Sequence, residues 1–341
     1  MISAMRAAFI FLPLLLSVNV QSALCSDSSE WLKKIGERRG KKVYQRHTSV
    51  AAVRGIQEPG EADPKARNFP AIEKMEAFKI EPSGLEAFIQ EGGLKKAPSP
   101  AAAPALPEKE TAEEIQTGRD VAANVAAQFS LVEQPELLRY VTLVGQAVAL
   151  ESGRPELTFR FAVLESSILN AFAAPGGYIF ISRGLLSLLE NESQLACVLA
   201  HEIAHVEKRH VLKATQKARL AQAAIPGYLR ATAKNASYLS QISELSIDLL
   251  WKGLSREDEL EADRRGYELA ALSGYDPASF FKVLSALKAR NGAAGDHPEL
   301  RFLLSTHPKI EDRMEQLKLK FGEAAPSGAK LPDRFRKNVK S

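Results

Sequence analysis

Two histidines with a glutamate between them form the most informative pattern in this sequence of 341 residues. The segment reads His201-Glu202-Ile203-Ala204-His205. On a helix, a spacing of four puts both imidazoles on one face, where they can hold one metal ion, and imidazole nitrogen suits zinc. Glu202 is offset by about 100° from His201, toward a metal-bound water, so its carboxylate is suited to act as general base and then acid.

A catalytic zinc site needs a third protein ligand, and an acidic segment further along the chain can supply it. Ser255 and Asp258 form an N-cap pair, so this segment is predicted to begin a helix. Glu259 and Asp263 share a face of that helix, whereas Glu261 points roughly 200° away from Glu259. Glu259 is therefore a candidate ligand, and Asp263 a candidate acceptor that orients a histidine ring. The alternative is a solvated acidic first turn, favoured by the helix dipole.

The spacing of apolar residues predicts the elements that position these groups. Helical spacing runs through residues 111–129 and 135–148, and two short strands are expected at 157–164 and 178–182. Helices then continue to about residue 320, and the helix with the two histidines is apolar on all sides, as a buried catalytic helix needs. We predict an α+β domain, mainly helical with a small β-sheet, over residues 111–320.

Together these motifs resemble metallopeptidase family 48, a gluzincin family, over about residues 111–320. Further segments that resemble the family are Asn170-Ala171-Phe172, Pro175-Gly176-Gly177, Ser255-Arg256, Ser305-Thr306-His307-Pro308 and Arg313. The resemblance implies a zincin-like metallopeptidase fold, one catalytic Zn²⁺ ion and endopeptidase activity on protein or peptide substrates. It also implies that His201, His205 and Glu259 are the metal ligands, with Asp263 behind them.

The resemblance further implies residues that bind substrate. The strand at residues 177–182 resembles an edge strand to which an extended substrate is added, so Gly177, Tyr178 and Ile179 are expected beside the peptide. An ordinary sheet strand is the alternative. Asn170 is expected either to bond the substrate or to fix the preceding turn, and Arg313 is assigned to the same substrate-binding set.

His307 is expected near the metal, and three roles stay open for it. Pro308 biases it toward an extended conformation, from which its side chain can project toward the cleft. A neutral imidazole would fill the open zinc position and block water, whereas a protonated one would donate to the oxyanion of the tetrahedral intermediate. The third role is packing in a loop. His210 lies off the face shared by the motif histidines and is expected to be solvated.

The two ends of the chain differ from its middle. Residues 1–25 are predicted to be an export signal, because Arg6 precedes an apolar run and small polar residues follow it. Cleavage is favoured over lipidation at Cys25 and over an uncleaved anchor. Residues 26–110 are expected to be a basic, flexible region with a Pro/Ala linker at its end, and residues 321–341 a basic disordered tail.

Charge and composition limit the classes of function. The chain has 45 Lys and Arg against 41 Asp and Glu, and 45% of its residues are hydrophobic. This composition excludes a wholly disordered chain and a polytopic membrane protein. The basic excess lies in residues 31–54 and 324–341, so the mildly acidic body is not expected to bind nucleic acid, and the ends are suited to peripheral contact with an anionic membrane.

These observations predict an exported, periplasmic zinc endopeptidase in envelope protein quality control, with an association with the membrane left open. The alternative is a chaperone or binding protein that keeps the protease fold with little turnover. An intact Glu202 disfavours that alternative. A structural zinc site is disfavoured because no thiol is suitably spaced. The sequence carries no signal for an oligomeric state.

Overall fold

The computed structural model describes residues 66–95, 107–223, 238–292, 310–322 and 327–339, all within one compact unit, Val53–Ser341. The predicted export signal, the basic segment 31–54, most of the Pro/Ala linker and His307 lie outside these ranges. Within the described ranges, no helix combines the length and apolar character needed to cross a bilayer.

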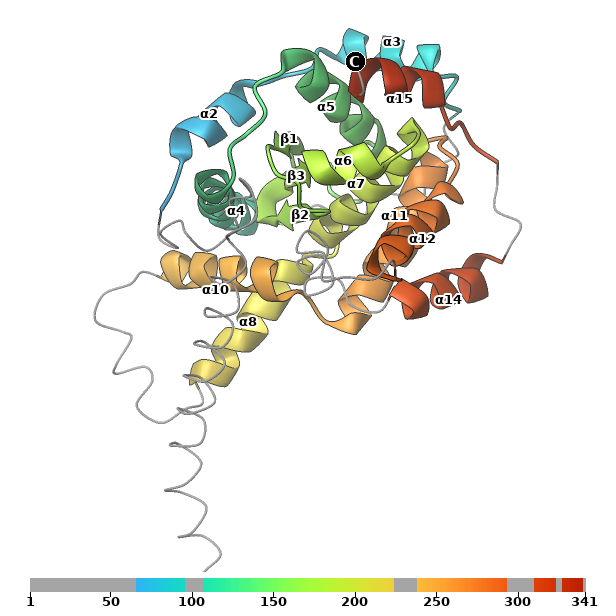
Figure 1. The fold of residues 1–341 in the computed structure, drawn as a ribbon. Coiled ribbons are helices and arrows are strands. Elements are labelled where there is room, and N and C mark those ends of the chain that lie inside the picture. Colours follow the sequence, from blue (N-terminus) through green and yellow to red (C-terminus); the bar gives the residue numbers. More distant parts are fainter. Residues whose placement is uncertain (1–65, 96–106, 224–237, 293–309, 323–326, 340–341) are drawn as a thin grey trace, which may run out of the picture. The chain divides into compact units, whose positions relative to one another are not determined.

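A three-stranded sheet forms the centre of the described fold (Figure 1). In spatial order its strands are β1 (Arg160–Leu164), β3 (Tyr178–Ser182) and β2 (Ala171–Ala174). β3 runs parallel to β1, with Phe161 opposite Ile179, and antiparallel to β2, with Phe172 opposite Phe180. Every strand residue except Arg160 is buried. Such continuous apolar runs are typical of strands that are covered on both faces.

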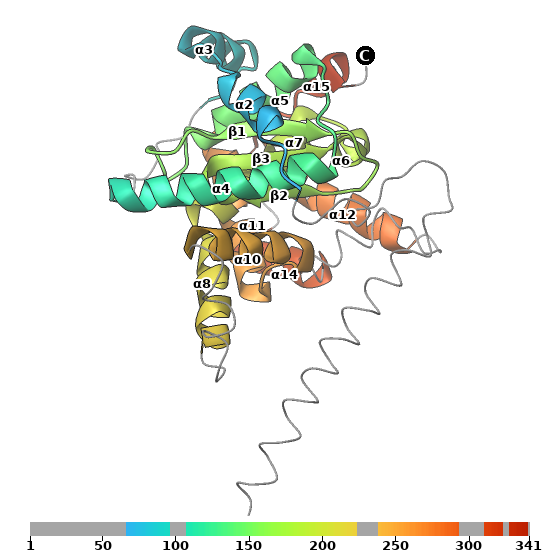
Figure 2. The same ribbon diagram turned by 90° about the vertical axis from the view of Figure 1, so that its left-hand side faces the viewer.

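Alternate residues of the strands point into two separate apolar layers. Val163 and Ile181 belong to the layer that contains α5 (Pro135–Ala149) and α7 (Glu192–Glu207). Leu164 and Phe180 belong to the opposite layer, which contains α4 (Glu108–Gln128). Figure 2 shows α4 crossing in front of the strands. The sheet therefore separates the helix with the two histidines from α4.

Main-chain contacts hold the turn between β2 and β3 against α4. Gly118 of α4 lies so close to this turn that a Cβ there would be 1.8 Å from the carbonyl oxygen of Pro175. Glu114, one turn earlier, accepts a hydrogen bond from the N–H of Gly176 at 3.2 Å. Gly176 and Gly177 have φ values of 70° and 91°, in the left-handed region that favours glycine. The Pro-Gly-Gly sequence thus docks the sheet on α4.

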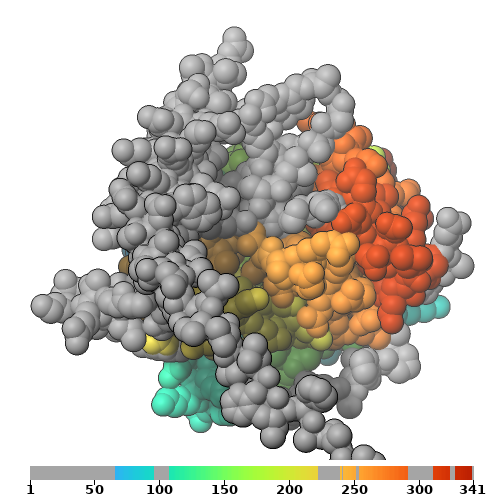
Figure 3. Space-filling model, turned by 90° about the horizontal axis from the view of Figure 1, so that it is seen from below, coloured from blue at the N-terminus to red at the C-terminus, as the bar shows by residue number. Residues whose placement is uncertain are grey.

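Besides α7, further helices follow the sheet within the described ranges. They are α6 (Arg183–Leu188), α8 (His210–Ala223), α10 (Tyr238–Lys252), α11 (Arg256–Leu272), α12 (Ser279–Gly292) and α14 (Ile310–Phe321). α10 packs on α8 and α4, α11 lies along α7, and α14 contacts α11 and α12. Figure 3 shows residues of α11 and α14, in orange and red, side by side on one face. The predicted class, mainly helical α+β with a small sheet, is confirmed.

Helices also occur in the N-terminal region 26–110, which the sequence analysis predicted to be flexible. α2 (Phe69–Ala77) packs on α4, and α3 (Pro82–Glu91) packs on α5. The prediction is wrong for these residues because Ile72 and Phe88 are buried in the apolar layers on either side of the sheet. Each helix buries only one or two apolar side chains, so its periodic signal is weak.

The prediction of a disordered tail at residues 321–341 is wrong for α15 (Pro332–Val339). Phe335 of this helix is fully buried in the layer that contains α7. Arg334 donates to the Glu192 carboxylate at the start of α7, with its Nε 2.6 Å from Oε2. The helix is thus fixed by a partner that precedes it by 142 residues, which local sequence patterns do not show.

Glu192 is a fully buried carboxylate that depends on its hydrogen bonds. Besides Arg334, the hydroxyls of Tyr140 and Tyr275 donate to it, each at 2.8 Å. Burial, followed by the charge of Glu192, raises the pKa of Tyr275 well above its usual value. The cluster joins α5, α7 and α15 at one point.

We expect Arg334→Ala to lower the free energy of unfolding by about 3 kcal/mol, because the buried Glu192 carboxylate loses its cation. Urea unfolding of the full chain measures this change. Arg336 is the matched control, since its ion pair with Asp333 is exposed, and its replacement by alanine should change the free energy by less than about 0.5 kcal/mol. Equal effects of the two substitutions would show that Glu192 does not depend on Arg334.

Candidate metal centre

His201 and His205 lie on α7, a helix that is buried on all sides. Asn191 caps its start by accepting a hydrogen bond from the N–H of Gln194 at 3.0 Å. The two imidazole rings face each other, with their Nε2 atoms 3.0 Å apart. Both histidines are almost fully buried, with exposures of 4% and 3%.

Glu259 comes from α11, whose start is fixed by the predicted N-cap pair. Ser255 Oγ accepts from the N–H of Asp258, and the Asp258 carboxylate accepts from the N–H of Ser255, both at 3.2 Å. One turn later, the carboxylate oxygens of Glu259 lie 3.6 Å from His201 Nε2 and 3.5 Å from His205 Nε2. The structure therefore brings together the three residues that were predicted as ligands.

Gly266 allows α11 to approach α7 this closely. A Cβ at Gly266 would lie 2.9 Å from both the Cα and the N of His201. Glu259 lies about two turns earlier on the same helix, so its reach to His201 depends on this approach. Gly266 is a site residue that the sequence predictions lack, although a glycine inside a helix is a signal of close backbone packing.

Asp263 lies directly behind His201, with Oδ1 2.9 Å from Nδ1. Arg313 of α14 donates two hydrogen bonds to the Asp263 carboxylate, at 2.7 and 2.6 Å. Burial alone would raise the pKa of Asp263, but Arg313 and His201 outweigh it and lower the pKa. A carboxylate that accepts from Nδ1–H leaves the Nε2 lone pair of His201 available to a metal.

The donor atoms fit one metal ion. Tetrahedral zinc with ligand bonds of about 2.0–2.1 Å separates neighbouring ligand atoms by about 3.3 Å. The separations here are 3.0 Å between the two Nε2 atoms and 3.5 and 3.6 Å from them to the Glu259 oxygens. A cation between the rings would be within reach of the Nε2 atoms of both imidazoles at once.

Glu202 follows His201 on α7 and is 3% exposed. Its side chain leaves the helix about 100° from that of His201. Burial alone would lower the pKa of Arg313, but nearby carboxylates outweigh it and raise the pKa: those of Asp263, Glu259 and Glu202. Glu202 is therefore part of the same buried charge cluster.

His210 is buried against His205 and is not solvated. It is 1% exposed, its Nδ1 lies 2.9 Å from Nδ1 of His205, and its Nε2 lies 3.2 Å from the Glu261 carboxylate. The expectation of a solvated His210 is wrong because it extended α7 as one continuous helix. Instead α7 ends at Glu207 and a new helix begins at His210, after Arg209 in a left-handed conformation with φ of 57°.

The strand that was predicted to receive substrate is the central strand of the sheet. β3 pairs with β1 on one side and β2 on the other, so Tyr178 and Ile179 have no open main-chain edge. Both side chains are fully buried. Gly177 packs so closely that a Cβ there would be 2.9 Å from the carbonyl oxygen of Thr158. The prediction that Gly177, Tyr178 and Ile179 contact a substrate strand is therefore wrong. The sequence indicates the strand but not its neighbours.

Asn170 lies directly before β2. Its main chain fixes the turn, since its carbonyl oxygen accepts from the N–H of Ser182 at 3.0 Å and its own N–H donates to Ser182 Oγ at 3.2 Å. The side chain is fully buried, and neither polar atom of its carboxamide has a hydrogen-bond partner within the described part of the chain. Asn170 therefore fixes the turn through its main chain, and its carboxamide is left available to a ligand.

Arg313 and His307 are two further residues that were predicted for the site. Arg313 is only 6% exposed and is engaged by Asp263, and its contact with substrate stays a prediction. His307 lies outside the described residues, so its three predicted roles stay predictions as well.

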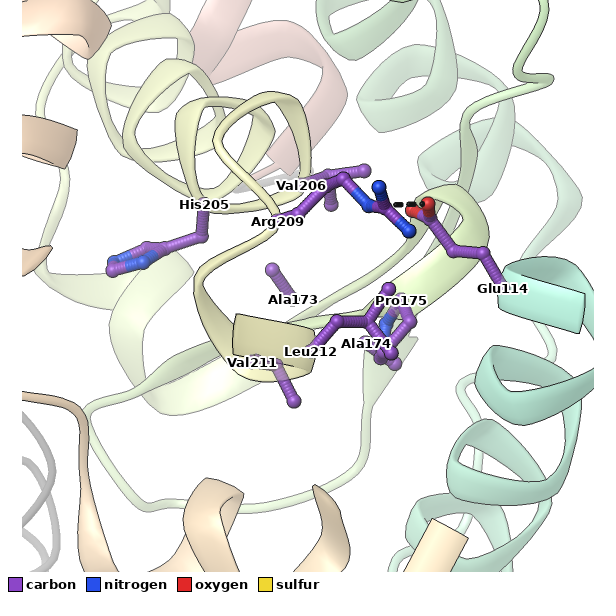
Figure 4. A pocket seen from close by; sticks show the side chains of 9 residues that line it. All are labelled: Glu114, Ala173, Ala174, Pro175, His205, Val206, Arg209, Val211 and Leu212. Carbon is purple, nitrogen blue, oxygen red and sulfur yellow. Dashed lines mark ion pairs between the residues drawn. The ribbon is translucent and has the colours of Figure 1, made fainter. Parts of the chain in front are cut away.

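A small pocket lies beside His205, between the end of β2 and the start of α8 (Figure 4). Arg209 forms an ion pair with Glu114, with its Nε 3.2 Å from Oε2. Figure 4 shows the Arg209 side chain directed toward Glu114 and the His205 side chain directed away from this pair. The ion pair ties the left-handed residue between α7 and α8 to α4.

We expect Gly266→Ala to lower the free energy of unfolding by about 1–3 kcal/mol and to weaken metal binding, because the new methyl group must push α11 away from His201. Urea unfolding and competition with a metal chelator measure the two effects. Gly153→Ala is the matched control, since the nearest atom to its added Cβ would be 3.6 Å away. Unchanged metal affinity in the Gly266 variant would contradict this dependence.

Comparison with known proteins agrees with this geometry. The model of peptidase family M48 matches residues 135–320. The beta-barrel assembly-enhancing protease of Yersinia pestis is 28% identical over 221 residues, which cover 63% of this chain and 45% of the relative. The protein of that name from Escherichia coli K12 is 27% identical over the same shares. The mitochondrial metalloendopeptidase OMA1 of Schizosaccharomyces pombe is 31% identical over 179 residues, 52% of this chain and 51% of the relative.

The chain spans about half the length of the curated relatives it matches. The family match covers more than half of this chain and includes α7, α11 and α14. His201, His205 and Glu259 all fall within it. From the match and the clustered ligands together, we conclude that this chain belongs to peptidase family M48, whose members are metal-dependent peptidases.

Proposed function

We propose that this chain is a zinc-dependent endopeptidase that hydrolyses peptide bonds in protein substrates. The observation that carries this proposal is that His201 and His205 of α7 and Glu259 of α11 offer ligand atoms within 4.8 Å of one another. Three protein ligands leave a position open for water, which is typical of catalytic rather than structural zinc sites. A zinc ion held there would polarise the scissile carbonyl and lower the pKa of a bound water.

Glu202 supplies the proton transfers of this reaction. Its carboxylate takes a proton from the water that attacks the peptide carbonyl, and it then delivers a proton to the amine nitrogen as the C–N bond breaks. Its burial at 3% exposure keeps this charge in a low-dielectric site. The intact Glu202 supports turnover over the alternative of a protease-fold chaperone or binding protein with little turnover.

We infer that β2, rather than β3, receives the main chain of the substrate. In an antiparallel pair, every second residue of a strand hydrogen-bonds to the neighbouring strand. The N–H of Ser182 donates to the carbonyl oxygen of Asn170, so the even-numbered residues of β2 are the ones that bond β3. Ala171 and Ala173 therefore direct their N–H and C=O groups away from β3. Ala173 lines the pocket beside His205, so a peptide added to this edge passes the metal ligands and the unbonded Asn170 carboxamide.

We further infer that the protein is exported to the periplasm and acts in envelope protein quality control. Support comes from the basic and then apolar N-terminal sequence and from the relatives named beta-barrel assembly-enhancing proteases. The basic segment 31–54 and the exposed basic residues of α15, Arg336 and Lys337, are suited to peripheral contact with an anionic membrane surface.

Glu202→Gln should abolish most proteolysis while zinc stays bound, because the amide cannot move the protons but leaves the three ligands in place. Loss of general acid–base catalysis is expected to lower kcat by about 10²–10⁴-fold. Casein hydrolysis by the full chain, together with zinc content by elemental analysis, measures both quantities. The matched control is Glu257→Gln on the exposed first turn of α11. Wild-type turnover in the Glu202 variant would remove Glu202 from the reaction.

Zinc affinity should rise with pH, because zinc must displace a proton from His201. Burial alone would lower the pKa of His201, but hydrogen bonds with Asp263 and Glu259 outweigh it and raise the pKa to about 9. The metal-free site is therefore protonated below about pH 9. We expect the association constant for zinc to increase about tenfold per pH unit from pH 7 to 9 and then to level off. Competition with a chelator of known affinity measures it. An affinity that is constant over this range would contradict proton displacement.

A further inference from the structure

The two metal-binding histidines are held from behind by different kinds of group. His201 Nδ1 lies against the carboxylate of Asp263, at 2.9 Å. His205 Nδ1 instead lies 2.9 Å from the Nδ1 of a third imidazole, that of His210. The rings of His205 and His210 meet edge to face, with an angle of 75° between their planes. An N–H···N hydrogen bond thus takes the place of the carboxylate bond on this side of the site.

The next hydrogen bond determines which nitrogen of each ring carries a proton. A carboxylate can only accept, so His210 Nε2 donates to Glu261 at 3.2 Å. Neutral His210 then has an unprotonated Nδ1, which accepts from Nδ1–H of His205. His205 is left with its lone pair on Nε2, the atom that faces His201 and Glu259.

We propose that His210 is a positioning residue of the metal site, which orients the ring of His205 and keeps its Nε2 free of a proton, and that Glu261 keeps His210 in the tautomer this requires. The proposal rests on the zinc site of the proposed function. It concerns binding of the metal, because His210 bonds the far side of the His205 ring and does not itself reach the other ligands.

Arg209 brings His210 to this place. Its left-handed conformation, with φ of 57°, turns the chain between α7 and α8, and such a conformation is costly for a residue other than glycine. Ion pairs with two residues of α4 hold it, Glu114 at 3.2 Å and Glu110 at 3.4 Å. α8 therefore starts at His210 with the imidazole directed back onto His205, where a continuous helix would have placed it on the far side.

Two substitutions of His210 separate positioning from packing. His210→Phe keeps a ring of similar size but has no acceptor, whereas the carboxamide oxygen of His210→Asn falls close to the place of Nδ1. We expect the phenylalanine variant of the full chain to bind zinc about 10–100-fold more weakly than wild type, the usual effect of removing such a partner. The asparagine variant should recover most of this loss. Glu261→Ala should weaken zinc binding in the same direction but less. Chelator competition measures all of these affinities.

Equal zinc affinity of the phenylalanine and asparagine variants would overturn the proposal, whether both equal wild type or both fall below it. Should the phenylalanine variant not fold, nuclear magnetic resonance of the zinc-loaded wild-type chain with ¹⁵N-labelled histidine decides. We expect a proton on His205 Nδ1 and a scalar coupling between the two Nδ1 atoms, and a His205 ring without that proton would contradict the proposal. Failure of the proposed function would give a different result from failure of this proposal. In that case the wild-type chain itself would bind no zinc.

Discussion

The metal centre depends on the direct contact of two helices at a position without a side chain. Gly266 lets α11 rest on the backbone of α7 at His201, where any Cβ would lie 2.9 Å from main-chain atoms. This contact sets the distance at which Glu259 meets the two histidines. The rest of the described fold supports it: the sheet and α5 pack on one side of α7, while α12 and α14 hold α11 and α7 from the other.

Buried negative charge favours the binding of a cation at this site. Three carboxylates, of Glu202, Glu259 and Asp263, are at most 3% exposed, and within the described part of the chain Arg313 forms ion pairs with Glu259 and Asp263. A divalent ion between the imidazoles would add positive charge to this buried cluster. Without metal, burial alone would lower the pKa of His201, but hydrogen bonds with Asp263 and Glu259 outweigh it and raise the pKa, because both carboxylates stabilise a protonated imidazole. Stability of the fold and affinity for metal are thus two consequences of one charge arrangement.

The sequence carried most of the ligand set but not the means of assembling it. His201, His205 and Glu259 follow from helical periodicity and one N-cap, which are local properties, and the mainly helical class follows from apolar spacing. Strand order is not local, so β3 was wrongly placed at an edge. His210 was misplaced because a single left-handed residue, Arg209, resets the helical phase. α15 was missed because its partner Glu192 lies far away in the sequence.

The central claim is that one metal ion joins α7 to α11 through His201, His205 and Glu259. A crystal of the zinc-loaded full chain, measured on both sides of the zinc absorption edge, tests it directly. We expect one anomalous peak, with Nε2 of both histidines and a carboxylate oxygen of Glu259 at about 2.0–2.2 Å. A peak coordinated by His210 or Glu261 instead, or no peak between the two helices, would contradict it.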